Sequence, residues 1–389
     1  MGARRDLRDP ARRAAADTGS PARRCILRAV AGGAGQAGLR ERGGRNGAGR
    51  RCADGAGAEG AACGGRGLSR LLYPLVPLYA AAAAAKSAAY DRGWLRAKRL
   101  RWPVVSVGNL SVGGSGKTPL VIRLAQLLCH RGVDVDVLSR GYGRSSAAVE
   151  RVDENGSAER FGDEPLLIAR AAHVPVYVAA KRFEAGLLAE RGAAEPGLHL
   201  LDDGFQHRQL RRDLDIVVLH RSDFAQSLLP AGRLREPLSA LQRASVLVLR
   251  EEDRGLEAEL RRRRLTQPVW FMQRRLEAPP VQRAVAFCGI ARPEEFFAAL
   301  RSAGIELCAA LSFRDHHRWT RDDITKLIEW QRQHRAKAFV TTEKDGVRLP
   351  AALRSRLESA APLYVAPLTV HLDDEAAAVD LLLRQAVRK

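Results

Sequence analysis

The amino-acid sequence predicts an α/β fold, with a parallel sheet covered by helices on both faces and a smaller second α/β domain. Short β-rich runs alternate with helical stretches in the first part of the chain, an order typical of a parallel sheet. These runs occupy 133–144, 174–180, 198–204, 214–220 and 245–250. An arginine-rich polar connection at 254–266 precedes a second α/β series over 283–345, which indicates the second domain.

The length of 389 residues suits two domains with additional segments. Residues 1–66 hold 14 arginines, six acidic residues and almost no aromatic or β-branched side chains, which predicts a disordered basic extension. The extension lacks the apolar core of a secretory signal, and we expect it to be dispensable or to reflect an upstream start codon. We expect the core domain over 102–270. The smaller domain is expected over 271–389, with a last helix that can dock back on the core.

Residues 67–101 differ in kind from the extension. They begin with an apolar, aromatic-tipped run and continue through an alanine-rich helix former to five basic residues between Arg92 and Arg101. The apolar run contains Pro74 and Pro77 and is too short to span a bilayer. One interpretation is an amphipathic helix on a membrane surface, with basic side chains toward anionic headgroups. An ordinary helix packed on the core, with a solvated basic end, explains the composition nearly as well.

A glycine-rich turn ending in Gly116-Lys117-Thr118 directly follows the apolar β-branched run VVSV. In that position its backbone N–H groups can surround an anion, and the following helix adds its positive end, as in P-loop NTPases. Lys117 is expected to reach the β- and γ-phosphates, and the Thr118 hydroxyl to bind Mg²⁺. A glycine turn with a chance lysine predicts neither the strand nor the helix. The expected nucleotide-binding residues are Ser111, which replaces the usual first glycine, Val112, Gly113, Gly114, Ser115, Gly116, Lys117 and Thr118.

Two acids, Asp202 and Asp203, end an apolar strand 85 positions after Lys117. A Walker-B strand places acids at this point to hold Mg²⁺ or its water shell. A polar turn would explain the acids alone, but the Gln206-His207 continuation disfavours it.

Charged residues also gather in Gly162-Asp163-Glu164-Pro165, in GRLREP with Glu236, and in Asp315-His316-His317. Taken singly, each acidic cluster is more often a helix-cap turn than a catalytic site. The histidine pair lacks a third ligand at metal-binding spacing, so a catalytic or structural role is favoured over a metal site.

The composition excludes several classes of protein. The net charge of +20 is not accompanied by an aromatic-studded basic patch, which argues against a nucleic-acid-binding protein. No C-x-x-C pair occurs among the cysteines, so neither a disulfide framework nor a zinc site is implied. The six cysteines are Cys25, Cys52, Cys63, Cys129, Cys288 and Cys308.

The motifs form an ordered series: SVGNLSVGGSGKTP, LSRGYGR, GDEP, LDDGFQH, GRLREP, FCGIARPEEF, FRDHH and VTTEKD. Over residues 67–389 this series closely resembles the tetraacyldisaccharide 4′-kinase family of lipid A biosynthesis. The resemblance implies an ATP- and Mg²⁺-dependent kinase that phosphorylates the 4′-hydroxyl of a tetraacyldisaccharide 1-phosphate. It also implies a peripheral enzyme on the cytoplasmic face of the bacterial inner membrane, with the lipid A disaccharide and the anionic membrane as partners. No nucleic acid or obligate protein partner is implied.

The resemblance also implies roles for individual residues. Asp163 resembles the general base, and a histidine of FRDHH, taken as His316 with His317 left open, resembles its partner across the domain cleft. Lys117 would stabilise the transferring phosphoryl group. The expected metal-binding residues are Thr118, Asp202 or Asp203, and Glu236.

A regulatory P-loop GTPase or ATPase with a partner-binding output is the main alternative. The run VTTEKD superficially resembles a guanine-reading loop. However, Lys344 is followed directly by Asp345, so the Asn/Thr-Lys-x-Asp spacing is absent.

Overall fold

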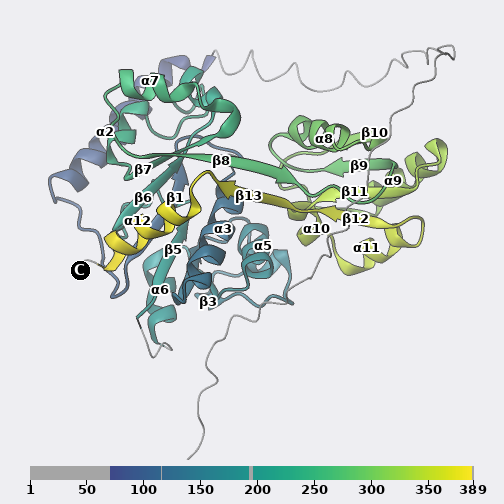
Figure 1. Cartoon of the computed structure of the whole chain (residues 1–389), viewed down its shortest axis with the longest axis horizontal. Helices are drawn as coiled ribbons and strands as arrows, with labels where there is room; N and C mark the ends of the chain where they lie inside the picture. Colours follow the sequence, from purple (N-terminus) through teal and green to yellow (C-terminus); the bar gives the residue numbers. More distant parts are fainter. Residues whose placement is uncertain (1–70, 115, 192–195, 388–389) are drawn as a thin grey trace, which may run out of the picture. The chain divides into compact units, whose positions relative to one another are not determined.

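The larger lobe is built on a mostly parallel sheet (Figure 1). The computed structural model describes residues 71–114, 116–191 and 196–387, and in these residues the sheet has nine strands, in the order β13-β8-β7-β6-β1-β5-β2-β4-β3. The central strand β1 pairs in parallel with β5 and β6. The two edge strands, β3 and β13, pair antiparallel with their neighbours. The strands are β1 (Val104–Asn109), β2 (Val135–Ser139), β3 (Glu150–Arg151), β4 (Val176–Val178), β5 (Leu198–Asp202), β6 (Leu214–Val218), β7 (Val246–Arg250), β8 (Val269–Leu276) and β13 (Leu368–Leu372).

Helices cover both faces of this sheet, as the sequence predicts. Inner strands are buried on both sides, so most of their residues are apolar. In β1, Val105 and Val107 belong to the core cluster under α3, α5 and α12, whereas Val104 belongs to the cluster under α6. A third cluster lies between β7 and α7. The helices are α3 (Lys117–His130), α4 (Ala158–Phe161), α5 (Asp163–Ala172), α6 (Arg182–Arg191), α7 (Leu256–Arg262) and α12 (Glu375–Val387), with short 3₁₀ turns at Arg221–Ala225, Leu238–Arg243 and Glu251–Asp253.

The smaller lobe has its own parallel sheet, in the order β10-β9-β11-β12. One core cluster of this lobe lies under α9 and α11 and another under α8, so this sheet is also covered on both faces. The predicted fold class is therefore confirmed for both parts. The elements are β9 (Arg283–Cys288), α8 (Pro293–Ser302), β10 (Glu306–Ser312), α9 (Arg321–His334), β11 (Ala338–Thr342), α10 (Glu343–Arg348), α11 (Ala351–Glu358) and β12 (Leu363–Ala366).

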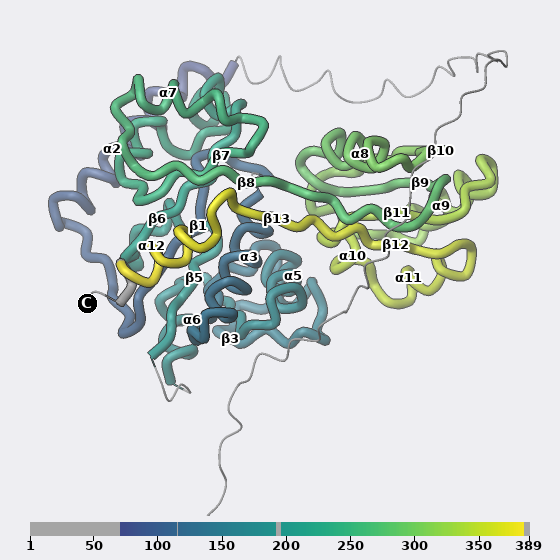
Figure 2. The backbone as a smooth tube through the Cα atoms, viewed as in Figure 1, coloured from purple at the N-terminus to yellow at the C-terminus, as the bar shows by residue number. Residues whose placement is uncertain are grey.

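The last strand and helix return to the larger lobe. Strand β13 pairs with β8, and the two strands form the connection between the lobes that can be followed in Figure 2. Helix α12 packs on α3, with Ala378, Val379 and Leu382 in the core of the larger lobe. The predicted domain at 271–389 therefore includes residues that belong physically to both lobes.

The N-terminal helix is shorter than the segment 67–101. A 3₁₀ turn at Tyr73–Leu75 leads into α2 (Val76–Asp91). Both have a proline at their second position, Pro74 and Pro77, and proline suits the first turn because its missing N–H is not needed there. Residues 92–101 form an irregular segment. Among the described residues, no helix is both long and apolar enough to cross a membrane. The extension predicted at 1–66 lies outside the described residues.

Candidate active site

The phosphate loop lies between β1 and α3, as predicted. Gly113 and Gly116 have φ angles of 109° and 90°, a region that glycine adopts without strain. A Cβ at Gly113 would also collide with the guanidinium of Arg233. The smaller lobe approaches this loop, because an added Cβ at Gly114 would lie 3.6 Å from the Cβ of Ala291. The loop is thus positioned between the two lobes.

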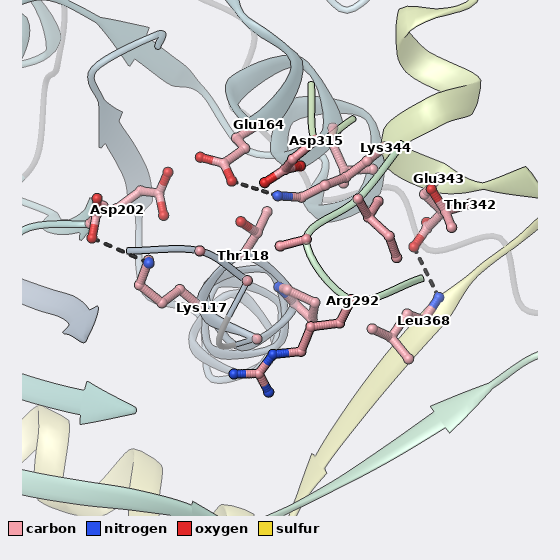
Figure 3. A pocket seen from close by; sticks show the side chains of 18 of the residues that line it. Lys117, Thr118, Glu164, Asp202, Arg292, Asp315, Thr342, Glu343, Lys344 and Leu368 are labelled. Carbon is pink, nitrogen blue, oxygen red and sulfur yellow. Dashed lines mark hydrogen bonds and ion pairs between the residues drawn. The ribbon is translucent and has the colours of Figure 1, made fainter. Parts of the chain in front are cut away.

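Lys117 is held at the first turn of α3, with 9% of the residue exposed. Its Nζ donates a hydrogen bond to Asn109 Oδ1 at 2.9 Å and lies 3.4 Å from Asp203 Oδ1. Thr118 is buried beside it, and Figure 3 shows both residues at the start of the helix. Asn109 and Asp203 therefore hold the ammonium group in position and balance its charge. Part of the residue remains open to a ligand.

The two predicted acids lie next to this lysine but differ in environment. Asp202 is buried at the end of β5, and its Oδ2 accepts a hydrogen bond from Ser139 at 3.1 Å. Its Oδ1 has no hydrogen-bond partner among the described residues. Burial and the neighbouring Glu164 and Asp203 carboxylates raise the pKa of Asp202 to about 7.

Asp203 follows in the left-handed region, with a φ of 49°. Arg235 donates a hydrogen bond to its Oδ2 at 2.9 Å. Burial alone would raise the pKa of Asp203, but Lys117 and Arg235 outweigh burial and lower it. Asp203 is therefore an ionised, paired carboxylate, whereas Asp202 has one unsatisfied oxygen.

Asp163 and His316 come together across the two lobes. Asp163 begins α5 in the larger lobe, and His316 lies in the loop after β10 in the smaller lobe. The His316 Nδ1 lies 2.9 Å from the Asp163 Oδ2, and the Arg348 Nε lies 3.3 Å from the same oxygen. His316 is held in place by a backbone hydrogen bond from its N–H to the carbonyl of Gly289, at 3.2 Å.

The two members of this pair differ in proton affinity and in access. Burial raises the pKa of Asp163, but His316, Lys344 and Arg348 outweigh burial and lower it to about 2. The hydrogen bond to Asp163 raises the pKa of His316, even though burial opposes this. His316 lines the cavity described below, whereas Asp163 is 6% exposed and does not.

A cavity of about 950 Å³ joins these groups. It is lined by the phosphate loop, by the carboxyl ends of β2 and β5, and by three charged residues of the smaller lobe, Arg292, His316 and Lys344. Sequence reasoning missed Glu164, Lys344 and Arg292 as wall residues, although their motifs GDEP, VTTEKD and FCGIARPEEF were recognised. Each of the three could have been predicted as a charged side chain inside a recognised motif.

Besides Asp163, two predicted residues, Glu236 and Ser111, and the alternative histidine, His317, do not line the cavity. The Glu236 Oε2 instead accepts a hydrogen bond from Arg243 at 2.7 Å. Ser111 is buried in an isolated bridge to Leu234. The His317 Nε2 lies 2.9 Å from Asp323 Oδ2, and its ring stacks on Phe313. Ser115 lies outside the described residues.

The chain matches the sequence profile of the family described as "Tetraacyldisaccharide-1-P 4'-kinase" over residues 68–387. The tetraacyldisaccharide 4′-kinase of Koribacter versatilis is 47% identical over 328 residues, which cover 81% of this chain and 99% of that protein. The enzyme of the same name from Geobacter metallireducens is 39% identical, over 79% of this chain and 96% of that protein. The solved structure of LpxK from Aquifex aeolicus, in complex with ATP, superposes with a TM-score of 0.65 at 34% identity and covers 82% of this chain and 99% of that one.

Proposed function

The chain belongs to the tetraacyldisaccharide 4′-kinase family, and we propose that the cavity between the phosphate loop and His316 carries out the reaction of that family. The protein is an ATP-dependent kinase that transfers a phosphoryl group to the 4′-hydroxyl of tetraacyldisaccharide 1-phosphate in lipid A biosynthesis. The observation that carries our assignment of the site is the contact between Asp163 of the larger lobe and His316 of the smaller lobe, because the cavity that His316 lines is also lined by the phosphate loop.

We assign the proton-accepting role to His316 rather than to Asp163, which reverses the roles expected from the sequence. A carboxyl group with a pKa of about 2 is a weak base, and Asp163 does not reach the cavity. The His316 ring lines the cavity, and its pKa is raised by Asp163. A base with a raised pKa accepts the hydroxyl proton more readily, and Asp163 would orient the ring and stabilise its protonated form.

The larger lobe provides the groups that bind the nucleotide in this proposal. Lys117 and the N–H groups of the phosphate loop would bind the β- and γ-phosphates. Phosphoryl transfer depends mainly on positioning and charge neutralisation, and Lys117 is pre-oriented by Asn109 and Asp203 for this purpose.

The donors beside Lys117 fit a magnesium ion. Asp202 presents a buried carboxylate oxygen without a partner, and the Thr118 hydroxyl lies in the same wall. No group of three or more acidic, histidine or cysteine ligands occurs in the described part of the chain. This agrees with Mg²⁺, which is commonly held by one or two carboxylates together with water and substrate phosphates. When bound, the ion would neutralise charge on the phosphates, with Asp202 and Thr118 as its protein contacts.

We also propose that the N-terminal segment docks on the anionic surface of the inner membrane, from its cytoplasmic side. No side chain of α2 is buried, and a group of large apolar side chains is exposed nearby. These exposed side chains are Leu71, Tyr73, Leu75, Leu78, Trp94 and Leu95. The helix is fixed to the core by polar contacts instead: Tyr79 donates to the carbonyl of Arg235 at 3.0 Å, and Arg208 pairs with Asp91 at 2.6 Å. Such an arrangement leaves the apolar side chains available to lipid.

Product analysis tests the proposed site. The chain is incubated with ATP, Mg²⁺ and tetraacyldisaccharide 1-phosphate in mixed micelles, and lipid phosphorylation is followed by mass spectrometry. We expect phosphorylation with the wild-type chain and a large loss with His316→Ala. Full activity of a folded His316→Ala variant would refute the assignment of the base.

A further inference from the structure

A second cation reaches the phosphate-binding side of the cavity from the smaller lobe. Lys344 lies in the first turn of α10, directly after β11. Its Nζ donates a hydrogen bond to Glu164 Oε1 at 2.6 Å, so this ion pair joins the smaller lobe to α5 of the larger lobe. Figure 3 shows Lys344 extended across the cavity toward Glu164.

Glu164 has cations on two sides. Lys344 lowers the pKa of Glu164 most strongly, against burial and Asp163, and Lys117 of the phosphate loop also lowers it. In the view of Figure 3, Thr118 lies between the two lysines. The carboxylate of Glu164 thus pairs with Lys344 and is also under the charge of Lys117, in the cavity that we propose binds the phosphates of ATP.

Lys344 is also close to the proton-transfer pair. Its charge lowers the pKa of Asp163 and opposes protonation of His316. Burial disfavours the charged amine, but Glu164 outweighs burial and raises the pKa of Lys344 to about 12. Lys344 therefore carries a full positive charge at neutral pH, beside the base that receives the acceptor proton.

An ion pair that only joined the two lobes would not need to lie in the wall of the cavity. The Lys344 and Glu164 side chains keep 24% and 26% of their surface exposed, so a ligand in the cavity can reach the ammonium group. Lys344 lines the cavity together with Lys117, Thr118 and His316. A mobile ammonium on a four-carbon stem can exchange a carboxylate partner for a phosphate oxygen without moving the backbone.

We propose that Lys344 is a catalytic residue that donates a hydrogen bond to the transferring phosphoryl group, and that Glu164 holds it in place when no nucleotide is bound. In the reaction, the bond between the γ-phosphorus and the β–γ bridging oxygen breaks, and the bond to the 4′-oxygen forms. The electron pair leaves with ADP, and the hydroxyl proton passes to His316. Lys344 would neutralise the negative charge on the phosphoryl oxygens, as an arginine supplied in cis does in other P-loop enzymes. This inference rests on the proposed function.

The test compares transition-state and ground-state binding in the full chain. Lys344→Ala, Lys344→Met and Lys344→Arg are assayed for kcat, for ADP affinity, and for the affinity of ADP with fluoroaluminate and Mg²⁺, which mimics the transferring group. Removing one donor to developing charge costs about 10²–10³ in kcat. We expect Lys344→Ala and Lys344→Met to lose about that factor in kcat and in fluoroaluminate affinity, with ADP affinity changed by less than about threefold. Lys344→Arg should recover part of both.

The matched control is Arg123→Ala. Arg123 pairs with Glu375 at 2.8 Å, both side chains are 24% exposed, and neither lines the cavity. This variant should retain wild-type kcat and fluoroaluminate affinity. Parallel losses of ADP and fluoroaluminate affinity in Lys344→Met, or unchanged kcat in that variant, would overturn the proposal and leave Lys344 as a tie between the lobes. Lipid phosphorylation by the wild-type chain tests the proposed function separately.

Discussion

Replacement of Asp163 by Asn tests the His316–Asp163 pair most informatively, because it keeps the shape of the side chain and removes its charge. The 2.9 Å contact raises the proton affinity of His316. A hydrogen bond to a charged group is worth about 1.5–3 kcal/mol. Since the His316 side chain is about one-third exposed, we take the lower end of this range as the energy that Asp163→Asn removes from the pair.

The expected result has two parts. A histidine base is active when it is neutral, so kcat/KM rises with pH through the pKa of His316. Asp163→Asn lowers this pKa, so the acidic limb of the profile should move to lower pH. Because the His316 base loses the carboxylate that orients it, the plateau should fall by up to the roughly 10²–10⁴ that a positioned base contributes, while KM for ATP changes little.

Steady-state kinetics from pH 5 to pH 9 measure both quantities. The double variant Asp163→Asn with His316→Ala should lose less activity than the product of the single losses, because the two residues act as a unit. His317→Ala is the control, since His317 contacts Asp323 and Phe313 and does not line the cavity. An unmoved acidic limb in Asp163→Asn, or fully multiplicative losses, would refute the reasoning.

Three further predictions concern other parts of the chain. Lys117→Ala should abolish turnover while the melting temperature changes by a few degrees at most, because Asp203 keeps Arg235 as a partner; near-normal kinase activity in this folded variant would contradict the role of Lys117. Tyr73→Asp with Leu78→Asp should reduce co-sedimentation with anionic vesicles, whereas removal of residues 1–66 should not; unchanged vesicle binding in the double variant would argue for an ordinary packed helix. His199 is buried between Asp136 at 2.7 Å and Glu190 at 3.4 Å, and although burial disfavours the charged ring, these carboxylates raise its pKa to about 9. The protonated His199 ring should stabilise the fold fully below pH 6.5, and this contribution should be lost as pH rises through about 9. His199→Ala should lower the free energy of unfolding in urea by about 3–5 kcal/mol at pH 7. Stability of the wild-type chain that does not change with pH over this range would argue against the buried charge.

The local pattern of the sequence predicts the larger fold well. Continuous apolar β-branched runs such as VVSV become buried parallel strands, and the glycines of the phosphate loop have the positive φ angles that their position requires. These features depend on short-range sterics and on burial of both faces of a strand. Asp202 and Asp203 were found in the same way, because the apolar run of β5 predicts where that strand ends.

Contacts between distant segments were harder to predict. The sequence places His316 and His317 side by side, and only the loop after β10 decides that His316 faces the cavity while His317 caps the core of its own lobe. Likewise, Glu236 lies in a conspicuous motif, but its carboxylate is taken by Arg243, which is seven residues away. The direction of a side chain in a loop depends on tertiary packing, which a motif does not encode.

The roles of paired ionisable groups could not be derived from the sequence either. Asp163 was expected to be the base because the GDEP motif resembles that of the kinase family. Its burial and its contacts with His316 and Arg348 leave it with a low proton affinity and no access to the cavity. The Glu164–Lys344 pair likewise exists only because α10 and α5, far apart in the chain, pack against each other.

The site of phosphorylation on the lipid tests the central claim most directly. The wild-type chain is incubated with ATP, Mg²⁺ and tetraacyldisaccharide 1-phosphate, and the product is analysed by ³¹P NMR and fragment-ion mass spectrometry, with Lys117→Ala as the blank. The account predicts one new phosphomonoester, at the 4′-oxygen, with the 1-phosphate retained and one ADP formed for each. ATP hydrolysis without lipid phosphorylation, or a phosphate at another hydroxyl, would contradict it.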